Sequence, residues 1–363
     1  MVNYDFLSVY FYSVPNLRFL KFNQNYETLQ LKNTLKIKSG KDQKQVEVEN
    51  GIYNIYGTGG IIGHTNTFLY DKESVGIGRK GTIDKPVYFN QPFWTVDTLF
   101  YSEIYEGFIP KYIFYLFQTI NWKKYNTSTG VPSLTSSSIE NIEKSFPCYD
   151  EQLKVANFLT MIDMRIETQI KIINDYKILK NHIIKSYIKQ NGTSYLLSEI
   201  AELGRGRVIN SAEISKQKNP IYPVYSSQTS NNGIMGYLDN YDYEGEYITW
   251  TTDGANAGTV YYRNGKFNCT NVCGILKIKN GYDAYYISNI LNCYTKKYVS
   301  TNLANPKLMN NVMANIKINL PSIEQQKHSS KILQSIEYRV EIEEDIKLNL
   351  VKQKAFLLKN MFI

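Results

Sequence analysis

The distribution of hydrophobic and polar residues divides the chain into two kinds of segment. Two long stretches, from Asp150 to about Gln190 and from Glu324 to about Asn360, contain neither Pro nor Gly. Their apolar residues recur at spacings of three and four, which is typical of one face of an α-helix. These positions are Val155, Leu159, Ile162, Ile166, Ile170, Ile173, Leu179, Ile183 and Tyr187 in the first stretch, and Leu333, Ile336, Val340, Leu350, Leu357 and Met361 in the second.

Each stretch therefore predicts one long helix. At a rise of about 1.5 Å per residue, a helix of about 38 residues spans about 60 Å, much more than an ordinary globular helix. Because a long helix with an apolar seam needs a partner, we expect the two helices to pack antiparallel as a coiled coil. The alternative is two unrelated amphipathic core helices.

The remaining stretches have a different pattern. Residues 29–145 and 196–319 contain short β-rich runs, such as Phe93-Trp94-Thr95-Val96, separated by turns rich in Gly and Asn. A short helical stretch lies near the end of each, around residues 110–124 and 284–299. We therefore expect two mixed α/β domains dominated by strands.

The two halves of the chain repeat each other. Segment 146–152 matches segment 320–326, and their prolines, Pro147 and Pro321, are 174 residues apart. The same shift pairs Leu159 with Leu333, Asp163 with Glu337, Arg165 with Arg339, Thr127 with Thr301, Pro132 with Pro306 and Leu134 with Leu308. Earlier, with shifts that vary as loop lengths would, 53–56 matches 222–225 and Gly81-Thr82 matches Gly258-Thr259. The predicted fold class is α+β: two β-rich mixed domains separated by two long antiparallel coiled-coil helices, in an internal pseudo-twofold repeat.

Composition and charge narrow the function only slightly. The 41 Lys and Arg residues outnumber the 33 Asp and Glu residues, which gives a net charge of +8. This excess is compatible with a polyanionic partner but does not establish one. The four cysteines form no C-x-x-C pair and the three histidines do not cluster near them, so neither a zinc site nor a disulfide framework follows. No run approaches the roughly 18 apolar residues of a membrane span. We expect a cytoplasmic protein with no membrane contact.

Motifs that carry catalysis are incomplete. Segment 76–81 has the G-x-G-x-x-G spacing of a dinucleotide-binding loop, but a strand-like run follows it where a helix is required. Segment 57–60 lacks the G-K-[ST] of a phosphate-binding loop, and segment 219–222 (N-P-I-Y) lacks the second proline of an adenine methyltransferase loop. We therefore expect no catalytic residue, no cofactor and no metal in this chain.

Three kinds of loop recur in both halves and suit DNA. Basic, glycine-containing turns open each domain, at 38–44 and 204–207, where Gly lets the backbone approach a phosphate that Lys and Arg neutralise. The paired loops 78–81 and 251–254 carry different side chains, as readers of different sequences would. Loops 126–132 and 300–306 are rich in small hydrogen-bonding groups, although Gly, Ser, Thr and Asn also simply make turns. The candidate DNA-binding residues are Lys38, Lys41, Lys44, Thr58, Arg79, Lys80, Lys123, Asn126, Thr127, Arg205, Arg207, Ser227, Gln228, Thr252, Asn302, Asn305 and Lys307.

Over nearly its whole length the chain resembles the specificity (S) subunits of type I restriction-modification systems. The stretches that carry the resemblance are 53–60 (YNIYGTGG), 77–82 (IGRKGT), 93–97 (FWTVD), 131–134 (VPSL) and 321–326 (PSIEQQ). Separately these motifs are loose, but their order and the duplication make them specific. One departure is Cys148-Tyr149 at the start of the first helix.

The resemblance implies a first target-recognition domain at 1–148, a spacer helix at 149–191, a second target-recognition domain at 192–321 and a second spacer helix at 322–363. Each domain would contact one half of a bipartite site on double-stranded DNA, and the helices would set the gap between the half-sites. Two methyltransferase subunits would dock on the chain and supply S-adenosylmethionine. Motor-nuclease subunits would use ATP and Mg²⁺.

Two other functions stay open from the residues alone. A self-contained methyltransferase or nuclease with degenerate motifs would bind S-adenosylmethionine as the isolated chain. A helical scaffold that binds only protein, as a decayed specificity subunit, would show no salt-sensitive DNA binding even with methyltransferase partners present.

Overall fold

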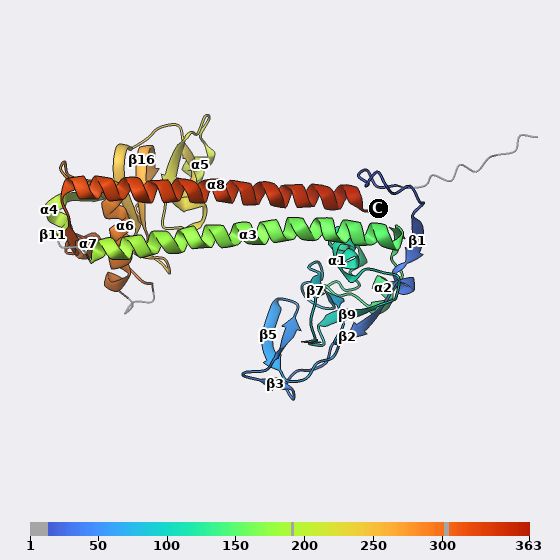
Figure 1. Cartoon of the computed structure of the whole chain (residues 1–363). Coiled ribbons are helices and arrows are strands. Elements are labelled where there is room, and N and C mark those ends of the chain that lie inside the picture. The colour runs from blue at the N-terminus through green and yellow to red at the C-terminus, as the bar shows by residue number, and fades with distance from the viewer. Residues whose placement is uncertain (1–13, 190–191, 301–304) are drawn as a thin grey trace, which may run out of the picture. The chain divides into compact units, whose positions relative to one another are not determined.

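The computed structural model describes residues 14–189, 192–300 and 305–363. These residues form two compact units. The first unit contains the described residues up to Ile170 together with Asp345–Ile363, and the second contains Lys171–Glu344. Each unit therefore holds one globular domain and a part of each of two long helices (Figure 1).

The two predicted long helices are α3 (Tyr149–Ile188) and α8 (Ile323–Met361). Pro147 and Pro321 stand just before their first turns, where the chain is still extended. Acidic residues occupy both first turns, and a lysine occupies each last turn, which suits the helix dipole. The absence of Pro and Gly from their interiors allows about eleven uninterrupted turns in each.

Ion pairs between the helices define their direction. In the second unit Lys177 pairs with Glu344 at 2.8 Å and Lys180 with Glu337 at 3.1 Å. Residue numbers fall along α8 as they rise along α3, so the two helices are antiparallel. In the first unit Lys354 contacts Asp163 at 2.7 Å. The antiparallel coiled coil predicted from the sequence is thus confirmed within each unit.

The apolar stripe of the helices is only partly buried. Leu159 and Leu333, which the duplication pairs, are both completely buried, and Ile173 and Leu350 are nearly so. Ile170 and Leu179 were expected on the same stripe but keep 43% and 46% of their surface exposed. The apolar stripe is therefore wider than the buried seam, and some of its positions do not face the other helix.

The first domain is built from two four-stranded sheets, β2-β9-β6-β7 and β3-β5-β4-β8, and a two-stranded pair, β1-β10. Its elements are β1 (Glu27–Gln30), η1 (Leu31–Asn33), β2 (Leu35–Ser39), β3 (Glu47–Val48), β4 (Tyr53–Gly57), β5 (Gly60–Thr65), β6 (Ser74–Gly78), β7 (Val87–Phe89), β8 (Phe93–Thr95), β9 (Leu99–Ile104), α1 (Pro110–Thr119), η2 (Trp122–Tyr125), α2 (Ser136–Glu140) and β10 (Glu143–Phe146).

The second domain has one six-stranded sheet, β12-β17-β15-β16-β13-β14, and the two-stranded pair β11-β18. Its elements are β11 (Thr193–Leu196), α4 (Leu197–Ile200), β12 (Ala201–Arg205), α5 (Ser211–Ser215), β13 (Tyr222–Tyr225), η3 (Ser230–Gly233), β14 (Ile234–Leu238), β15 (Tyr243–Thr251), β16 (Val260–Cys269), β17 (Cys273–Ile278), α6 (Ala284–Tyr294), η4 (Thr295–Tyr298), α7 (Asn310–Ala314) and β18 (Lys317–Leu320). The short helices expected near the end of each domain are therefore present, as α1 with η2 and α6 with η4.

The duplication predicted from the sequence is visible in the strand pairing. β4 runs parallel to β8, with Tyr56 opposite Thr95, and β13 runs parallel to β16, with Tyr225 opposite Cys269. Thr95 and Cys269 are 174 residues apart, the same shift as in the helices. The two domains thus share one framework, which the sequence match of 53–56 with 222–225 had indicated.

A buried glutamine fastens each long helix to its own domain. Gln152 donates to the carbonyl of Pro147 at 3.1 Å and accepts from the backbone N–H of Ile109, just before α1. Gln326 makes the same two bonds, to Pro321 and Asp283, just before α6. Figure 1 shows α1 lying against α3 and α6 lying beside the paired helices. The apolar cores of the domains continue onto the helices, where Val155 and Leu159 join the first and Tyr187 borders the second.

Candidate nucleic-acid interface

The three kinds of loop singled out in the first domain meet at one place. The backbone N–H of Lys41 donates to Thr95 at 2.9 Å, and that of Arg79 donates to Thr98 at 2.8 Å. The N–H of Gly81 then donates to Pro132 at 2.8 Å, which ties the loop after β6 to the loop before α2. We call this meeting of segments 39–41, 79–81 and 126–136 the first junction. It encloses an open, polar cavity of about 660 Å³ whose lining includes Ser39, Arg79, Lys80 and Ser133.

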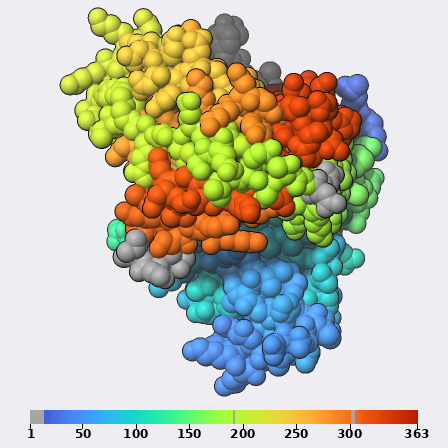
Figure 2. Space-filling view, turned by 90° about the vertical axis from the view of Figure 1, so that its left-hand side faces the viewer, coloured from blue at the N-terminus to red at the C-terminus, as the bar shows by residue number. Residues whose placement is uncertain are grey.

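The second domain repeats the arrangement bond for bond. The N–H of Arg207 donates to Cys269 at 3.1 Å, that of Thr252 donates to Val272 at 3.2 Å, and that of Gly254 donates to Pro306 at 3.0 Å. We call segments 205–207, 252–254 and 305–310 the second junction. Arg205 and Asn310 are 105 residues apart in the chain yet share a hydrogen bond here. Figure 2 shows that yellow and orange segments of this domain, which are distant in the sequence, lie next to each other on one face.

These bonds correct one detail of the sequence alignment. Gly81 and Gly254 have equivalent partners, Pro132 and Pro306, so Gly254 is the structural counterpart of Gly81. The match of Gly81-Thr82 with Gly258-Thr259 was wrong, since Gly258 donates instead to Thr251. Loops 78–81 and 251–254 are thus matched frames with different side chains, as expected.

The candidate cations of the first domain fall into two groups. Lys38 is paired with Glu103 at 3.3 Å, and Lys123 with Asp84 at 3.5 Å. Arg79 is exposed, with its guanidinium 3.3 Å from the carbonyl of Asp97 and 6.0 Å from the ring centre of Phe100.

Four of these side chains form no ion pair with the described residues: Lys41, Lys44, Arg79 and Lys80. Their charges are available to an anion without first breaking an ion pair.

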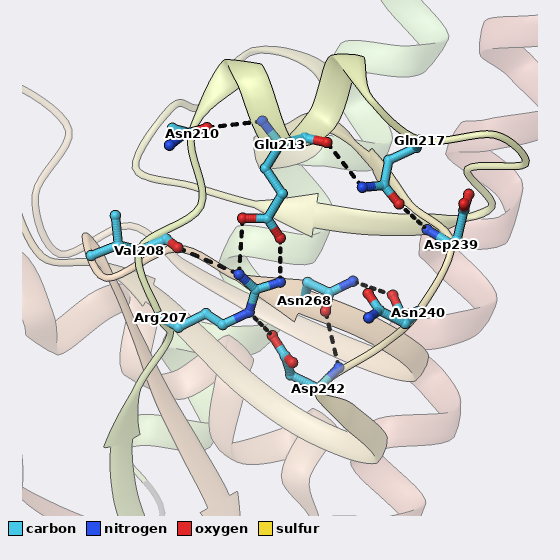
Figure 3. Close-up of polar contacts among 9 residues, drawn as sticks. All are labelled: Arg207, Val208, Asn210, Glu213, Gln217, Asp239, Asn240, Asp242 and Asn268. Atoms are coloured by element: carbon cyan, nitrogen blue, oxygen red, sulfur yellow. Dashed lines mark hydrogen bonds and ion pairs between the residues drawn. The ribbon is translucent and has the colours of Figure 1, made fainter.

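Arg207, a candidate of the second domain, is already neutralised. Its guanidinium forms two bonds with the carboxylate of Glu213, at 2.6 and 3.0 Å, and a third with Asp242 at 3.0 Å (Figure 3). Arg207 lowers the pKa of Glu213, chiefly through the hydrogen bond. The geometry makes Arg207 a clip between α5, which carries Glu213, and the loop before β15, which carries Asp242.

The other cations of the second junction differ from each other. Lys307 pairs with Asp253 at 3.4 Å. Arg205 is exposed and has no carboxylate partner among the described residues; its guanidinium contacts Asn310 at 3.1 Å and the sulfur of Met309 at 3.2 Å. Among the described residues of this junction, Arg205 is therefore the cation that has no carboxylate partner.

The uncharged candidate residues differ in their hydrogen bonds and in their exposure. Asn126 accepts hydrogen bonds from the backbone N–H groups of Ser128 and Ser133, and Thr127 donates to the carbonyl of Ser133, so both shape their own loop. Gln228 donates to Ile234 within its turn.

Thr58 and Ser227 are half-buried, Asn305 is exposed, and Asn302 lies outside the described residues. Thr252 is completely buried with its hydroxyl bonded to Asp253 and Val272, so it builds the frame and cannot reach DNA in this conformation.

Sequence reasoning missed Arg263. This residue is 4% exposed and lies between the rings of Tyr225 and Tyr261, with centroids at 3.6 and 4.4 Å. It donates to Thr249 and to the carbonyl of Asn232, which fixes the turn that follows Ser227 and Gln228. Burial lowers its pKa. An arginine in a strand gives no signal of this role, because its partners are distant in sequence.

The described residues also bear on metal binding and on membrane spanning. In the part of the chain that the structure describes, His, Cys, Asp and Glu side chains form no group of three that could hold a metal ion. Within the same residues, no helix has the length and apolarity needed to cross a membrane.

Comparison with known families decides how these junctions are to be interpreted. Residues 23–175 and 191–353 match the type I restriction modification DNA specificity domain. The chain belongs to this family. The match comprises two copies of the domain, in agreement with the duplication, and the DNA-specificity function predicted from the sequence is confirmed. The protein-only scaffold is not favoured.

Relatives of known description agree with this assignment. A putative type I specificity subunit of Mycoplasma pneumoniae is 37% identical over 224 residues, which cover 59% of this chain and 82% of the relative. The specificity subunit of the type I restriction enzyme MpnII, from the same organism, is 39% identical over 172 residues, 47% of this chain and 51% of the relative.

Solved structures agree in fold. The crystal structure of a type I restriction-modification S subunit from M. genitalium has a TM-score of 0.68 at 17% identity and covers 97% of this chain and 99% of its own. A chain from a study of complex assembly in the type I system has a TM-score of 0.58 at 10% identity and covers 93% of this chain and 97% of its own. The predicted α+β architecture is therefore confirmed.

Proposed function

We propose that each domain of this type I DNA specificity subunit reads one half of a bipartite DNA site through its junction. One observation supports this most: the same framework of backbone hydrogen bonds occurs twice, with different side chains mounted on it. In the first junction Arg79 and Lys80 stand where the second has Thr252 and Asp253. Two identical backbone frameworks would position both domains in the same way on DNA. Because the frameworks carry different polar side chains, the two domains would recognise different base sequences.

The helices α3 and α8 act in this proposal as the spacer between the half-sites. A helix keeps a fixed rise of about 1.5 Å per residue, and duplex DNA rises about 3.4 Å per base pair, so helix length converts into a number of unread base pairs. The interhelical ion pairs and buried leucines support a stiff element suited to this role.

The partners follow from the same proposal. The chain recognises DNA and does not catalyse; two methyltransferase subunits supply S-adenosylmethionine, and motor-nuclease subunits use ATP and Mg²⁺, all in the cytoplasm. Within the first unit, α3 and α8 border an apolar groove of about 490 Å³ that includes Met161, Met164, Ile346 and Leu350. Met161 and Met164 are 55% and 60% exposed. Exposed methionines adapt well to a protein partner, so this groove is our candidate for methyltransferase docking.

Exchange of one domain tests the proposal. Residues 29–145 are replaced by those of another family member, and the hybrid is expressed with the methyltransferase subunit in a host whose methylated sites are then mapped. We expect one half-site to change while the other half-site and the gap stay the same. Methylation at unchanged sites, or a change in both half-sites at once, would contradict the proposal.

A further inference from the structure

The two junctions each hold one free arginine, and these arginines come from different positions of the shared framework. In the first domain the arginine is Arg79, in the loop after β6, and the end of β2 carries Ser39. In the second domain the loop position carries Thr252, and the arginine is Arg205, at the end of β12.

The strand register shows that Arg205 is the counterpart of Ser39. Ser39 lies opposite Phe100 in the β2–β9 pair, and Arg205 lies opposite Gly274 in the β12–β17 pair. Phe100 and Gly274 are separated by the repeat shift of 174 residues. Ser39 and Arg79 both line the cavity of the first junction, so the two framework positions face the same space.

The contacts of Arg205 point to the same space. Its guanidinium touches Met309 and Asn310, and the repeat shift makes these the counterparts of Thr135 and Ser136. Thr135 and Ser136 line the first cavity beside Arg79. A guanidinium thus reaches the equivalent region of both junctions from two different sides.

Each arginine is oriented but not neutralised. The guanidinium of Arg79 is held by one peptide carbonyl and one aromatic ring, and that of Arg205 by an amide oxygen and a thioether, all of them uncharged. A guanidinium has five N–H donors, so most of them stay available. Arg207, only two residues from Arg205, instead uses its guanidinium N–H donors to bind the carboxylates of Glu213 and Asp242.

We propose that Arg79 and Arg205 are the residues that read guanine in the first and second half-site, and that Arg207 is a positioning residue. This inference rests on the proposed function. The paired N–H donors of a free guanidinium match the O6 and N7 acceptors that guanine presents in the major groove. Lys80, a point charge beside Arg79, is assigned to a phosphate.

The test uses the full chain assembled with its methyltransferase subunit and a library of duplexes in which both half-sites are randomised. Binding and methylation are read out by sequencing for the wild type and for Arg79→Lys, Arg205→Lys and Lys80→Ala. The lysine variants keep the positive charge and remove the paired N–H donors of the guanidinium. We expect Arg79→Lys to reduce the preference for guanine at one base pair of one half-site by about 5- to 150-fold, a loss of about 1–3 kcal/mol.

The design contains its own controls. Arg205→Lys should act in the same way on the other half-site only, so the unaltered half-site reports correct folding and assembly in each variant. Lys80→Ala should weaken binding to all sequences alike and reduce the salt dependence.

Three results would overturn the inference. If a lysine variant keeps every base preference of the wild type, the arginine contacts a phosphate. If it loses all binding, the arginine is structural. A wild-type complex that selects no bipartite site would overturn the proposed function as well, which separates the two failures.

Discussion

Single residues at the junctions act mainly through the backbone. Gly40 and Gly206 are needed for a close approach: a Cβ at Gly40 would overlap the carbonyl oxygen of Val96, and one at Gly206 would overlap that of Cys269. The sequence indicated glycines that bring the backbone close to a phosphate, but the structure shows them pressed against the neighbouring strand. Their role is to let the basic turn lie on the sheet, and the charges beside them are positioned as a consequence.

Gly206→Ala should therefore disturb the second junction. Because the new methyl group has no room, we expect a loss of about 1–3 kcal/mol in the free energy of unfolding of this domain, measured by denaturant titration. Gly204→Ala is the matched control two residues away, where a Cβ would have nothing within 4 Å. Equal losses in both variants would mean that the close approach is unimportant.

The clip formed by Arg207 should weaken in acid. Arg207 holds the pKa of Glu213 below its usual value, so the clip is fully present above the ordinary carboxylate pKa and is lost as the pH falls through the lowered one. The pair is partly exposed, so its stabilisation is about 1 kcal/mol or less.

The protection of residues 207–217 against hydrogen exchange, taken relative to the intrinsic exchange rate at each pH, should fall on acidification in the wild type. In Glu213→Gln this protection should already be low at neutral pH. Unchanged protection in that variant would show that the clip does not order the segment.

At the scale of elements, the sequence predicted the features that depend on residues near each other in the chain. It did not reveal the contacts between residues of different loops. The helices were readable because a spacing of three and four is visible within one stretch, and the repeat because residues such as Gln152 and Gln326 keep one shift. The neutralisation of Arg207 by Asp242 was not readable, because their contact depends on how two loops fold together. The same holds for the burial of Thr252, which a polar loop sequence does not reveal.

The buried glutamines make the junction between domain and helix testable. Gln326→Leu leaves the carbonyl of Pro321 and the N–H of Asp283 without their partner, so we expect a loss of about 1–3 kcal/mol in stability, read from thermal unfolding. Gln334→Ala, at an exposed position of the same helix, is the control and should change stability by less than about 0.5 kcal/mol. If the two variants unfold alike, the glutamine does not fasten the helix.

For the whole molecule, the proposed spacer gives a prediction about DNA geometry. The two units divide α3 after Ile170 and α8 before Asp345, which identifies matched points in the two helices. Inserting seven residues at both points lengthens each helix by about 10.5 Å, equivalent to about three base pairs, and seven residues preserve the heptad seam. The mapped methylation sites should then show a gap about three base pairs longer with both half-sites unchanged.

The same insertion in α3 alone provides the control for the spacer. It would shift the apolar seam and the ion pairs of one helix past those of the other, for example Lys180 past Glu337, so this variant should lose stability and methylation together. The matched insertion should restore both, because every buried contact regains its partner. If the matched insertion instead altered the bases recognised, the helices would take part in base recognition. The assignment of recognition to the junctions and of spacing to the helices would then be wrong.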